Sequence, residues 1–177
     1  MKGKIIILSG PAGVGKSTTA STLTRNFNKS AYISGDIISQ FPVSGYEKPW
    51  ESKSAKDLVL KNILDLSKNF LTQGYNVISD WVIFWDDAKK ISKPILDLGY
   101  EVHYAVLWSD EITNFKRDKL REIECQMGER VKVLRNEFKT SNIPNQYFLD
   151  NTNLDLDQVV STILSNENFI ISLDDFN

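Results

Sequence analysis

A chain of 177 residues with a formal net charge of −2 has the length of one globular domain and lacks the strong positive charge of proteins that cover nucleic-acid backbones. Apolar residues make up 41% of the chain and charged residues 25%, values that exclude the disordered and fibrous classes. Cys125 is the only cysteine, and no apolar run approaches the length of a membrane span, so disulfide frameworks, thiolate metal sites and membrane proteins are excluded as well. We expect one cytoplasmic domain, residues 1–177, without nucleic-acid or membrane partners.

The apolar pattern predicts strands and helices in alternation. The apolar residues of Lys4–Ser9 follow one another without polar interruption, which is typical of a strand buried on both faces, and a helical period over 16–27 predicts a helix after it. The other expected elements are strands at 30–34, 76–80, 101–108 and 146–149, helices at 55–71, 86–98, from 110 onward, 131–139 and 155–165, and a terminal strand or docked tail at 169–173. This alternation predicts an α/β fold, with a parallel sheet covered by helices on both faces.

A glycine-rich segment, GPAGVGKS, lies between the first expected strand and the first expected helix. It matches the pattern G-x-x-x-x-G-K-[ST], and ligands of parallel sheets bind at this edge, beyond the carboxyl ends of the strands. The glycines let successive backbone N–H groups point inward as an anion-binding nest, while Lys16 adds positive charge toward the β and γ phosphates and Ser17 offers a hydroxyl to Mg²⁺. The sequence therefore predicts a nucleoside triphosphate site formed by Gly10, Ala12, Gly13, Val14, Gly15, Lys16, Ser17 and Thr18.

Other classes of protein with this loop fit the sequence less well. A GTPase switch protein would carry an Asn-Lys-x-Asp guanine motif, but here Asn28 and Lys29 are followed by Ser-Ala, and helicases and transporter ATPases are normally much longer. The chain resembles the small P-loop kinases, which include gluconate kinase, shikimate kinase and chloramphenicol phosphotransferase. It is most similar to the gluconate kinase type, in the glycine-rich loop, in YISGD (32–36), in KPW (48–50) and in FKRDKLR (115–121).

The resemblance implies both a fold and an activity. The implied fold is a three-layer α/β sandwich whose five-stranded parallel sheet has the order 2-3-1-4-5, with an arginine-bearing lid at about residues 117–132. The implied cofactors are ATP and Mg²⁺. The implied reaction moves the γ-phosphoryl group of ATP to a hydroxyl of a small molecule such as gluconate, a sugar, a nucleoside or an antibiotic.

Two carboxylates are candidates for the chemistry. In the kinases that the chain resembles, a carboxylate at the position of Asp36 holds and deprotonates the acceptor hydroxyl, a role typically worth about 10² to 10⁴ in rate. The structural alternative is that Asp36 caps a helix that begins near Ile37. Two residues earlier these kinases often have an acidic residue that organises Mg²⁺, where this chain has Ser34. Asp80, at the end of the expected strand 76–80, is the natural replacement as a metal or substrate ligand, the alternative being a turn or cap residue.

Four arginines lie close together in the second half of the chain, whereas none occurs in 26–116. Arg117 and Arg121 are four residues apart, so we expect them on one helix face as a clamp for phosphate oxygens, joined by Arg130 from across the lid. Arg135 is expected on the surface. The alternative is a solvated charged helix in which the arginines pair with Asp118, Glu122 and Glu124.

The acceptor side of the expected site carries lysines and aromatic residues instead of arginines. Lys48 suits a carboxylate such as that of gluconate, but the lack of arginines fits a neutral acceptor at least as well. Five aromatic residues flank the expected pocket, and we expect about two of them to line it, Trp50 and Trp81, with the others in the core: Tyr46, Phe84 and Trp85. The resemblance also implies that Asn151 and Thr152 contact adenine.

Two further functions stay open at this level. A regulatory protein would use the same loop to sense ATP without phosphorylating an acceptor. A kinase of polynucleotide ends would share the loop and Asp36, but the acidic balance of the chain counts against it. His103, inside the expected strand 101–108, is expected to be structural, and Cys125 shows no sign of activation.

Overall fold

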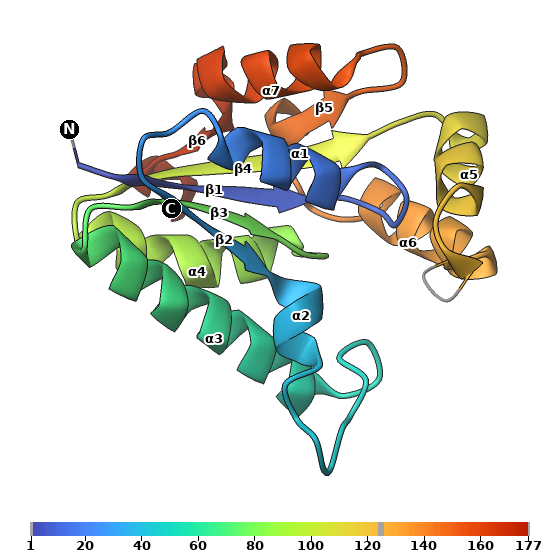
Figure 1. Cartoon of the computed structure of the whole chain (residues 1–177), viewed down its shortest axis with the longest axis horizontal. Helices are drawn as coiled ribbons and strands as arrows, with labels where there is room; N and C mark the ends of the chain where they lie inside the picture. The colour runs from blue at the N-terminus through green and yellow to red at the C-terminus, as the bar shows by residue number, and fades with distance from the viewer. Residues whose placement is uncertain (1, 124–125, 177) are drawn as a thin grey trace.

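A computed structural model describes residues 2–123 and 126–176 of the protein. Its sheet has the strand order β2-β3-β1-β4-β5, and these strands pair in parallel (Figure 1). The expected order 2-3-1-4-5 is therefore confirmed. A short sixth strand pairs antiparallel with β4. The strands span Lys4–Ser9 (β1), Ser30–Ser34 (β2), Asn76–Asp80 (β3), Glu101–Trp108 (β4), Phe148–Asp150 (β5) and Ile170–Ile171 (β6).

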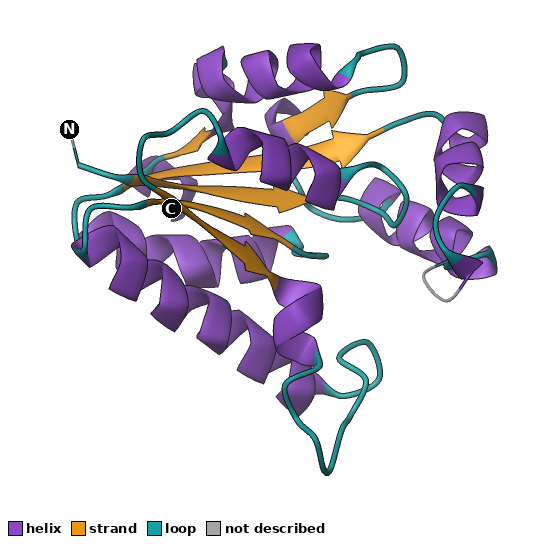
Figure 2. Ribbon diagram, in the orientation of Figure 1, coloured by secondary structure: helices purple, strands orange, loops and turns teal. Residues whose placement is uncertain are grey.

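Helices cover both faces of the sheet, which confirms the three-layer α/β arrangement (Figure 2). In Figure 1, α1 and α7 lie on one face and α3 and α4 on the other, while α5 and α6 stand beyond the carboxyl ends of the strands. The helices span Lys16–Thr24 (α1), Gly35–Ser39 (α2), Lys53–Thr72 (α3), Trp85–Asp97 (α4), Glu111–Lys119 (α5), Glu129–Lys139 (α6) and Leu156–Ser165 (α7). In the described ranges, no helix combines the length and the apolar character needed to cross a membrane.

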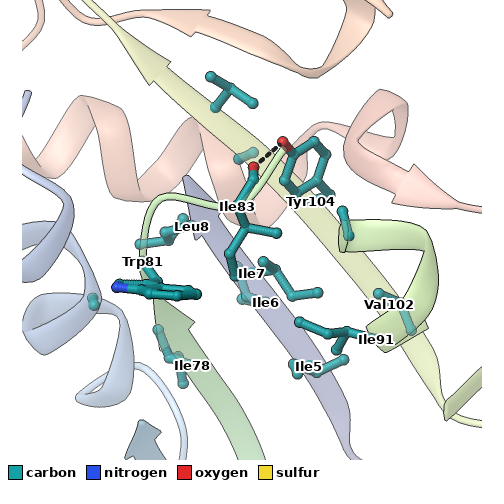
Figure 3. Close-up of a cluster of buried hydrophobic side chains, with 14 of the residues drawn as sticks. Ile5, Ile6, Ile7, Leu8, Ile78, Trp81, Ile83, Ile91, Val102 and Tyr104 are labelled. Atoms are coloured by element: carbon teal, nitrogen blue, oxygen red, sulfur yellow. Dashed lines mark hydrogen bonds between the residues drawn. The ribbon is translucent and has the colours of Figure 1, made fainter. Parts of the chain in front are cut away.

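The central strand of the sheet, β1, is apolar over residues 5–8. The side chains of 5–8 in β1 are completely buried, because β1 lies between β3 and β4 and helices cover it above and below. Around this strand pack Ile78, Ile91 and Val102 (Figure 3). The buried hydroxyl of Tyr104 donates to the carbonyl oxygen of Ile83 at 2.7 Å, so its one polar atom is satisfied inside the core. This packing fixes the end of β1, from which the glycine-rich loop starts.

Local chemistry explains where several elements begin. Asp110 precedes α5, and its Oδ1 accepts a hydrogen bond from the N–H of Thr113 at 2.7 Å. Asp155 precedes α7 in a capping box with Gln158, each side chain accepting from the backbone N–H of the other. Ser34 precedes α2 as its N-cap, and its hydroxyl oxygen accepts a hydrogen bond from the N–H of Ile37. The suggestion that Asp36 is the cap of this helix is therefore wrong.

The element boundaries agree with expectation for the strands and less well for some helices. The expected strands 4–9, 30–34, 76–80 and 101–108 are confirmed to the residue. The first helix ends at Thr24 and α5 already ends at Lys119, so the long charged helix expected after 110 is wrong. Beyond α7 the chain forms β6, framed by 3₁₀ helices at Glu167–Phe169 and Leu173–Phe176, and a third precedes β5 at Asn145–Tyr147.

Candidate functional site

The glycine-rich loop wraps around its own lysine at the carboxyl end of β1. Gly10 has φ 130°, and a Cβ at this position would overlap the carbonyl oxygen of Leu107, so both the backbone conformation and the space require glycine. The ammonium of Lys16 donates to the carbonyl oxygens of Gly10 and Pro11, at 2.9 Å each. The exposed side chains of Ser17 and Thr18 follow at the start of α1. The loop thus has the shape of an anion-binding nest at a helix N-terminus.

The charges of two carboxylates influence the pKa of Lys16. Burial lowers the pKa of Lys16, while the negative charges of Asp36 and Asp80 raise it and the positive charge of Arg121 lowers it further. The net direction is downward from 10.5. The loop, α2, β3 and the segment after α5 therefore bring one ammonium, one guanidinium and two carboxylates close enough for their charges to interact. This is the combination of groups expected around a transferring phosphoryl group.

The carboxylate of Asp80 accepts two side-chain hydrogen bonds. Its Oδ2 accepts from the hydroxyl of Ser17 at 2.8 Å, and its Oδ1 accepts from the hydroxyl of Tyr32 at 2.7 Å. Burial raises the pKa of Asp80 and the two hydrogen bonds oppose the rise, leaving a net upward direction. Burial and the hydrogen bond to Asp80 raise the pKa of Tyr32 to about 12, so the phenol keeps its proton and donates. The structure thus places Asp80 beside Ser17, as the sequence predicts.

Asp36 projects from α2, immediately after β2. It lies in the first turn of this helix and is exposed, and the hydroxyl of Ser39 donates to its carbonyl oxygen at 2.7 Å. The start of α2 lies directly against the residue that follows β3, since a Cβ on Gly35 would overlap the indole ring of Trp81. Trp81 itself is only 7% exposed, so it supports the backbone beside Asp36 from within the core.

Two side chains to which the sequence analysis gave no part in the site, Asn114 and Arg135, support the loop. Asn114, fully buried on α5, donates from Nδ2 to the carbonyl oxygen of Ala12 at 2.6 Å. Arg135 on α6 donates to Asn114 Oδ1 at 3.1 Å and to the carbonyl oxygen of Ser109 at 2.7 Å, and its guanidinium stacks on Trp108. Arg135 is only 5% exposed, so its expected surface position is wrong. It shares the helix face of apolar neighbours three and four residues away, which was the signal for its burial.

We expect Arg135→Met to lower the free energy of unfolding by about 2 to 4 kcal/mol, because the carbonyl oxygen of Ser109 and Asn114 Oδ1 would stay buried without their donor. Urea denaturation at pH 7 measures the change. Arg25, which is exposed just after α1, supplies the control variant, Arg25→Met. Equal losses in the two variants would show that the buried contacts of Arg135 contribute little.

The arginines expected to form one clamp have different partners. Arg117, near the end of α5, donates to Asn151 Oδ1 at 2.9 Å and to its carbonyl oxygen at 3.1 Å. Asn151 Nδ2 in turn donates to the carbonyl oxygen of Val14 in the loop at 2.9 Å. Arg121 lies beyond the last residue of α5, so the expectation that it shares a helix face with Arg117 is wrong. Arg121 is the arginine whose charge acts on Lys16.

The third arginine of the expected clamp contacts the acceptor side. The guanidinium of Arg130, in the first turn of α6, stacks over the ring of Trp50 at 4.8 Å from its centroid. Trp50 is 51% exposed and its indole N–H donates to Glu51, which also pairs with Lys48 at 3.3 Å. Lys48 is therefore already paired within its own segment.

The remaining expected residues are placed as follows. Tyr46 is 46% exposed, like Trp50, whereas Trp85 is 6% exposed and packs in the core, against which Phe84 is partly buried. His103 is 3% exposed in β4, its Nε2 lies 2.5 Å from Glu101 Oε1, and burial lowers its pKa. The Thr152 hydroxyl donates to Asp150 at 2.6 Å. Glu124 and Cys125 lie outside the described residues.

Tyr32 is the other residue that sequence reasoning missed. It is part of the quoted segment YISGD, yet no role was assigned to it. Because side chains of a strand alternate between its faces, Tyr32 and Ser34 point to the same side, and Ser34 lies opposite Asp80 in the parallel register. This period of two places Tyr32 on the side of Ser34, but its partner Asp80 follows only from the register of β2 with β3.

The fold of the chain is similar to that of several solved structures. The chain matches the tunicamycin resistance protein of Deinococcus radiodurans over 92% of its length and 94% of the other chain, with TM-score 0.63 and 21% identity. A gluconokinase from Sinorhizobium meliloti 1021 matches over 93% and 90%, with TM-score 0.66 and 19% identity. The Mycobacterium tuberculosis APS kinase, in complex with AMPPNP and APS, matches over 92% and 96%, with TM-score 0.67 and 16% identity.

Sequence comparison adds one curated relative. The chain is 33% identical over 105 residues to tRNA dimethylallyltransferase 9 of Arabidopsis thaliana, a match that covers 55% of this chain. The matched region is only 20% of that protein, so the chain spans about a fifth of the relative's length. No protein-family model matches the chain.

Proposed function

We propose that the protein is an ATP-dependent phosphotransferase that moves the γ-phosphoryl group of ATP to a hydroxyl of a small molecule. The observation that carries this proposal is that Asp80 accepts a hydrogen bond from Ser17 of the glycine-rich loop at 2.8 Å. Asp36 lies in the first turn of α2, just after Ser34, which is opposite Asp80 in the parallel register. Two carboxylates therefore lie at the ends of neighbouring strands, at the edge of the sheet where the loop lies, one suited to a metal and the other to an acceptor hydroxyl. Two proteins of the same fold are kinases by name, and one was determined with AMPPNP, which supports the proposal.

The chain's own residues supply each part of the proposed reaction. Asp36 accepts the proton of the acceptor hydroxyl. The acceptor oxygen then forms a bond to the γ phosphorus while the bond from that phosphorus to the bridging oxygen breaks, and ADP leaves. The loop amides and Lys16 bind the phosphates, and Arg121 stabilises the negative charge that develops during transfer. Asn151, held by Arg117, fixes the loop at Val14.

Ser17, at the start of α1, and Asp80, at the end of β3, suit Mg²⁺. Ser17 Oγ and Asp80 Oδ2 are oxygen atoms 2.8 Å apart, and oxygen is the ligand that Mg²⁺ prefers. Among the described residues no group of three or more His, Cys, Asp or Glu side chains could hold a metal, so Ser17 and Asp80 would share Mg²⁺ with water and phosphate oxygens. When bound, Mg²⁺ neutralises charge on the β and γ phosphates.

We expect Tyr32→Phe to weaken metal binding to the nucleotide complex by about tenfold, because the phenol orients Asp80 and outer-shell hydrogen bonds of this kind typically contribute 10- to 100-fold. Mn²⁺ binding in the presence of AMPPNP, followed by electron paramagnetic resonance, measures the loss directly. Binding of metal-free ATP should not change. Tyr100→Phe, at the residue just before β4, is the matched control, and an equal effect in both variants would remove Tyr32 from this role.

An acceptor screen tests the proposal. The purified protein, ATP and Mg²⁺ are combined with gluconate, neutral sugars, nucleosides and antibiotics, and ADP release is recorded for each. We expect at least one acceptor class to stimulate ADP release and to appear as a phosphomonoester by phosphorus NMR. ADP release that no acceptor stimulates would support instead a regulatory ATPase.

A second transferase function follows from the relative in Arabidopsis. Its name describes transfer of a dimethylallyl group to tRNA, and a loop that binds phosphates could equally hold a diphosphate donor. The same screen therefore includes tRNA with dimethylallyl diphosphate. Prenylated tRNA, with no phosphorylation of small molecules, would favour this function over the kinase.

A further inference from the structure

An apolar cavity lies beside the helix that carries Asp36. It has a volume of about 290 Å³, is open to solvent on one side, and is lined by α2, the segment 40–52 and the first half of α3. Its apolar lining includes Ile38, Phe41, Pro49, Leu58 and Val59. This volume is near the lower end of the range for small-molecule sites, about 300 to 1,000 Å³.

The cavity reaches the helix that carries the candidate catalytic carboxylate. Ile38 and Ser39 line it from the last turn of α2. Ser39, three residues after Asp36, lies on the same side of the helix as Asp36, whereas Ile38 lies on the other side. Ser39 also donates to the Asp36 carbonyl oxygen at 2.7 Å. A molecule whose hydroxyl lies at Asp36 can therefore place another of its groups in the cavity.

The charge of the cavity restricts what it can hold. Glu47 is its one charged lining residue, and the carboxylate accepts hydrogen bonds from Ser52 and Ser54. In the described ranges 2–123 and 126–176, no Lys, Arg or His lines the cavity. An anionic group would lose its hydration there without gaining a cation, and it would meet Glu47.

Exposed apolar side chains continue from the cavity to the surface. Ile37, Phe41 and Val43 are 59%, 61% and 98% exposed. Apolar side chains grouped on one exposed segment are typical of a binding surface. With Tyr46 and Trp50, they give the segment 37–50 five exposed large apolar residues.

From these observations, and resting on the proposed kinase function, we infer that the acceptor is a hydroxyl compound with an uncharged alkyl or aryl group, which binds in the cavity between α2 and α3. The hydroxyl faces Asp36 and the apolar group contacts Leu58 and Val59. Anionic acceptors such as gluconate are disfavoured, because Lys48 pairs with Glu51 and no arginine lies in 26–116.

Alkyl glucosides of increasing chain length test the inference by binding alone. Calorimetry on the intact protein compares methyl, butyl and hexyl β-glucoside, with a glucoside whose hexyl chain ends in a carboxylate as the anionic counterpart. We expect affinity to rise about tenfold from butyl to hexyl, since each buried methylene typically adds a factor of three to four. The carboxylate should abolish this gain.

A pair of leucine variants locates the effect. Leu58 lines the cavity and is 50% exposed, whereas Leu98 follows α4 and is 47% exposed. Leu58→Glu should remove the dependence on chain length and leave ATP affinity unchanged, and Leu98→Glu should change neither. Equal behaviour of the two variants, or no dependence on chain length in the wild type, would overturn the inference.

Two further outcomes separate this inference from the proposed function. Phosphorylation of small acceptors without any preference for an apolar group would support the kinase function but refute the inference that the cavity binds the acceptor. Glucoside binding that Leu58→Glu abolishes, without phosphorylation of any acceptor, would support the cavity as a ligand site and refute the kinase function. Light scattering that shows a dimer dissociated by Leu58→Glu would assign the surface to a second copy of the chain and overturn the inference.

Discussion

Replacement of Asp36 by Asn is expected to lower kcat by about 100-fold or more, while the Kd for ATP stays unchanged. The amide keeps the size and the hydrogen-bonding capacity of the side chain but cannot take up the proton of the acceptor hydroxyl. Because Asp36 is exposed and Ser34 caps α2, the variant should fold normally. Initial rates with saturating acceptor, together with ATP titration by calorimetry, measure the two quantities separately.

The matched control is Asp65→Asn, since Asp65 is also an exposed aspartate on a helix but lies in the middle of α3. It should retain full turnover. An Asp36→Asn enzyme that is as fast as the control would exclude Asp36 as the base and would leave Asp80 as the remaining carboxylate of the site.

Replacement of Lys16 by Met is expected to weaken ATP binding and to reduce turnover by about 100- to 1,000-fold, the usual cost of removing one preorganised donor to a developing charge. Met keeps the apolar stem but has no ammonium to contact phosphate. The carbonyl oxygens of Gly10 and Pro11 lose their donor as well, so the loop itself becomes less ordered. Calorimetric titration with ATP gives the loss of affinity.

Lys61→Met provides the comparison, because Lys61 is an exposed lysine on α3. It should bind ATP like the wild type. Thermal melts of both variants without nucleotide establish that each is folded. Unchanged ATP affinity in Lys16→Met would mean that the glycine-rich loop does not bind triphosphate, and the proposed function would fail with it.

The fold could be predicted because its strands are continuous apolar runs. The run 5–8 has no polar side chain to place on a solvent face, so it fits only the middle of a covered sheet. Helix ends were harder to predict, since periodicity continues past the point where the backbone turns. Phe27 has the helical spacing of α1, although the helix stops at Thr24 and Phe27 packs against the core from the following turn.

The candidate site was predictable where it lies within one motif and unpredictable where it depends on distant contacts. Lys16 and Ser17 follow directly from the loop pattern. The contact between Tyr32 and Asp80 joins residues 48 positions apart, and its partner depends on strand order and register. Arg135 reaches the loop through Asn114, a bridge of two side chains from different helices. The helical period indicates which face of a helix is buried, but it does not indicate which polar groups accept hydrogen bonds from a buried arginine such as Arg135.

The stacking of Arg130 on Trp50 provides the protein with an intrinsic optical probe. Of the four tryptophans, Trp50 is the exposed one, and a guanidinium lies 4.8 Å from its ring. Indole emission responds to nearby charge and to water, so any separation of α6 from the segment 40–52 changes the fluorescence of this residue. Stopped-flow fluorescence can therefore follow, without an attached dye, how nucleotide and acceptor each change the contact between α6 and the segment 40–52.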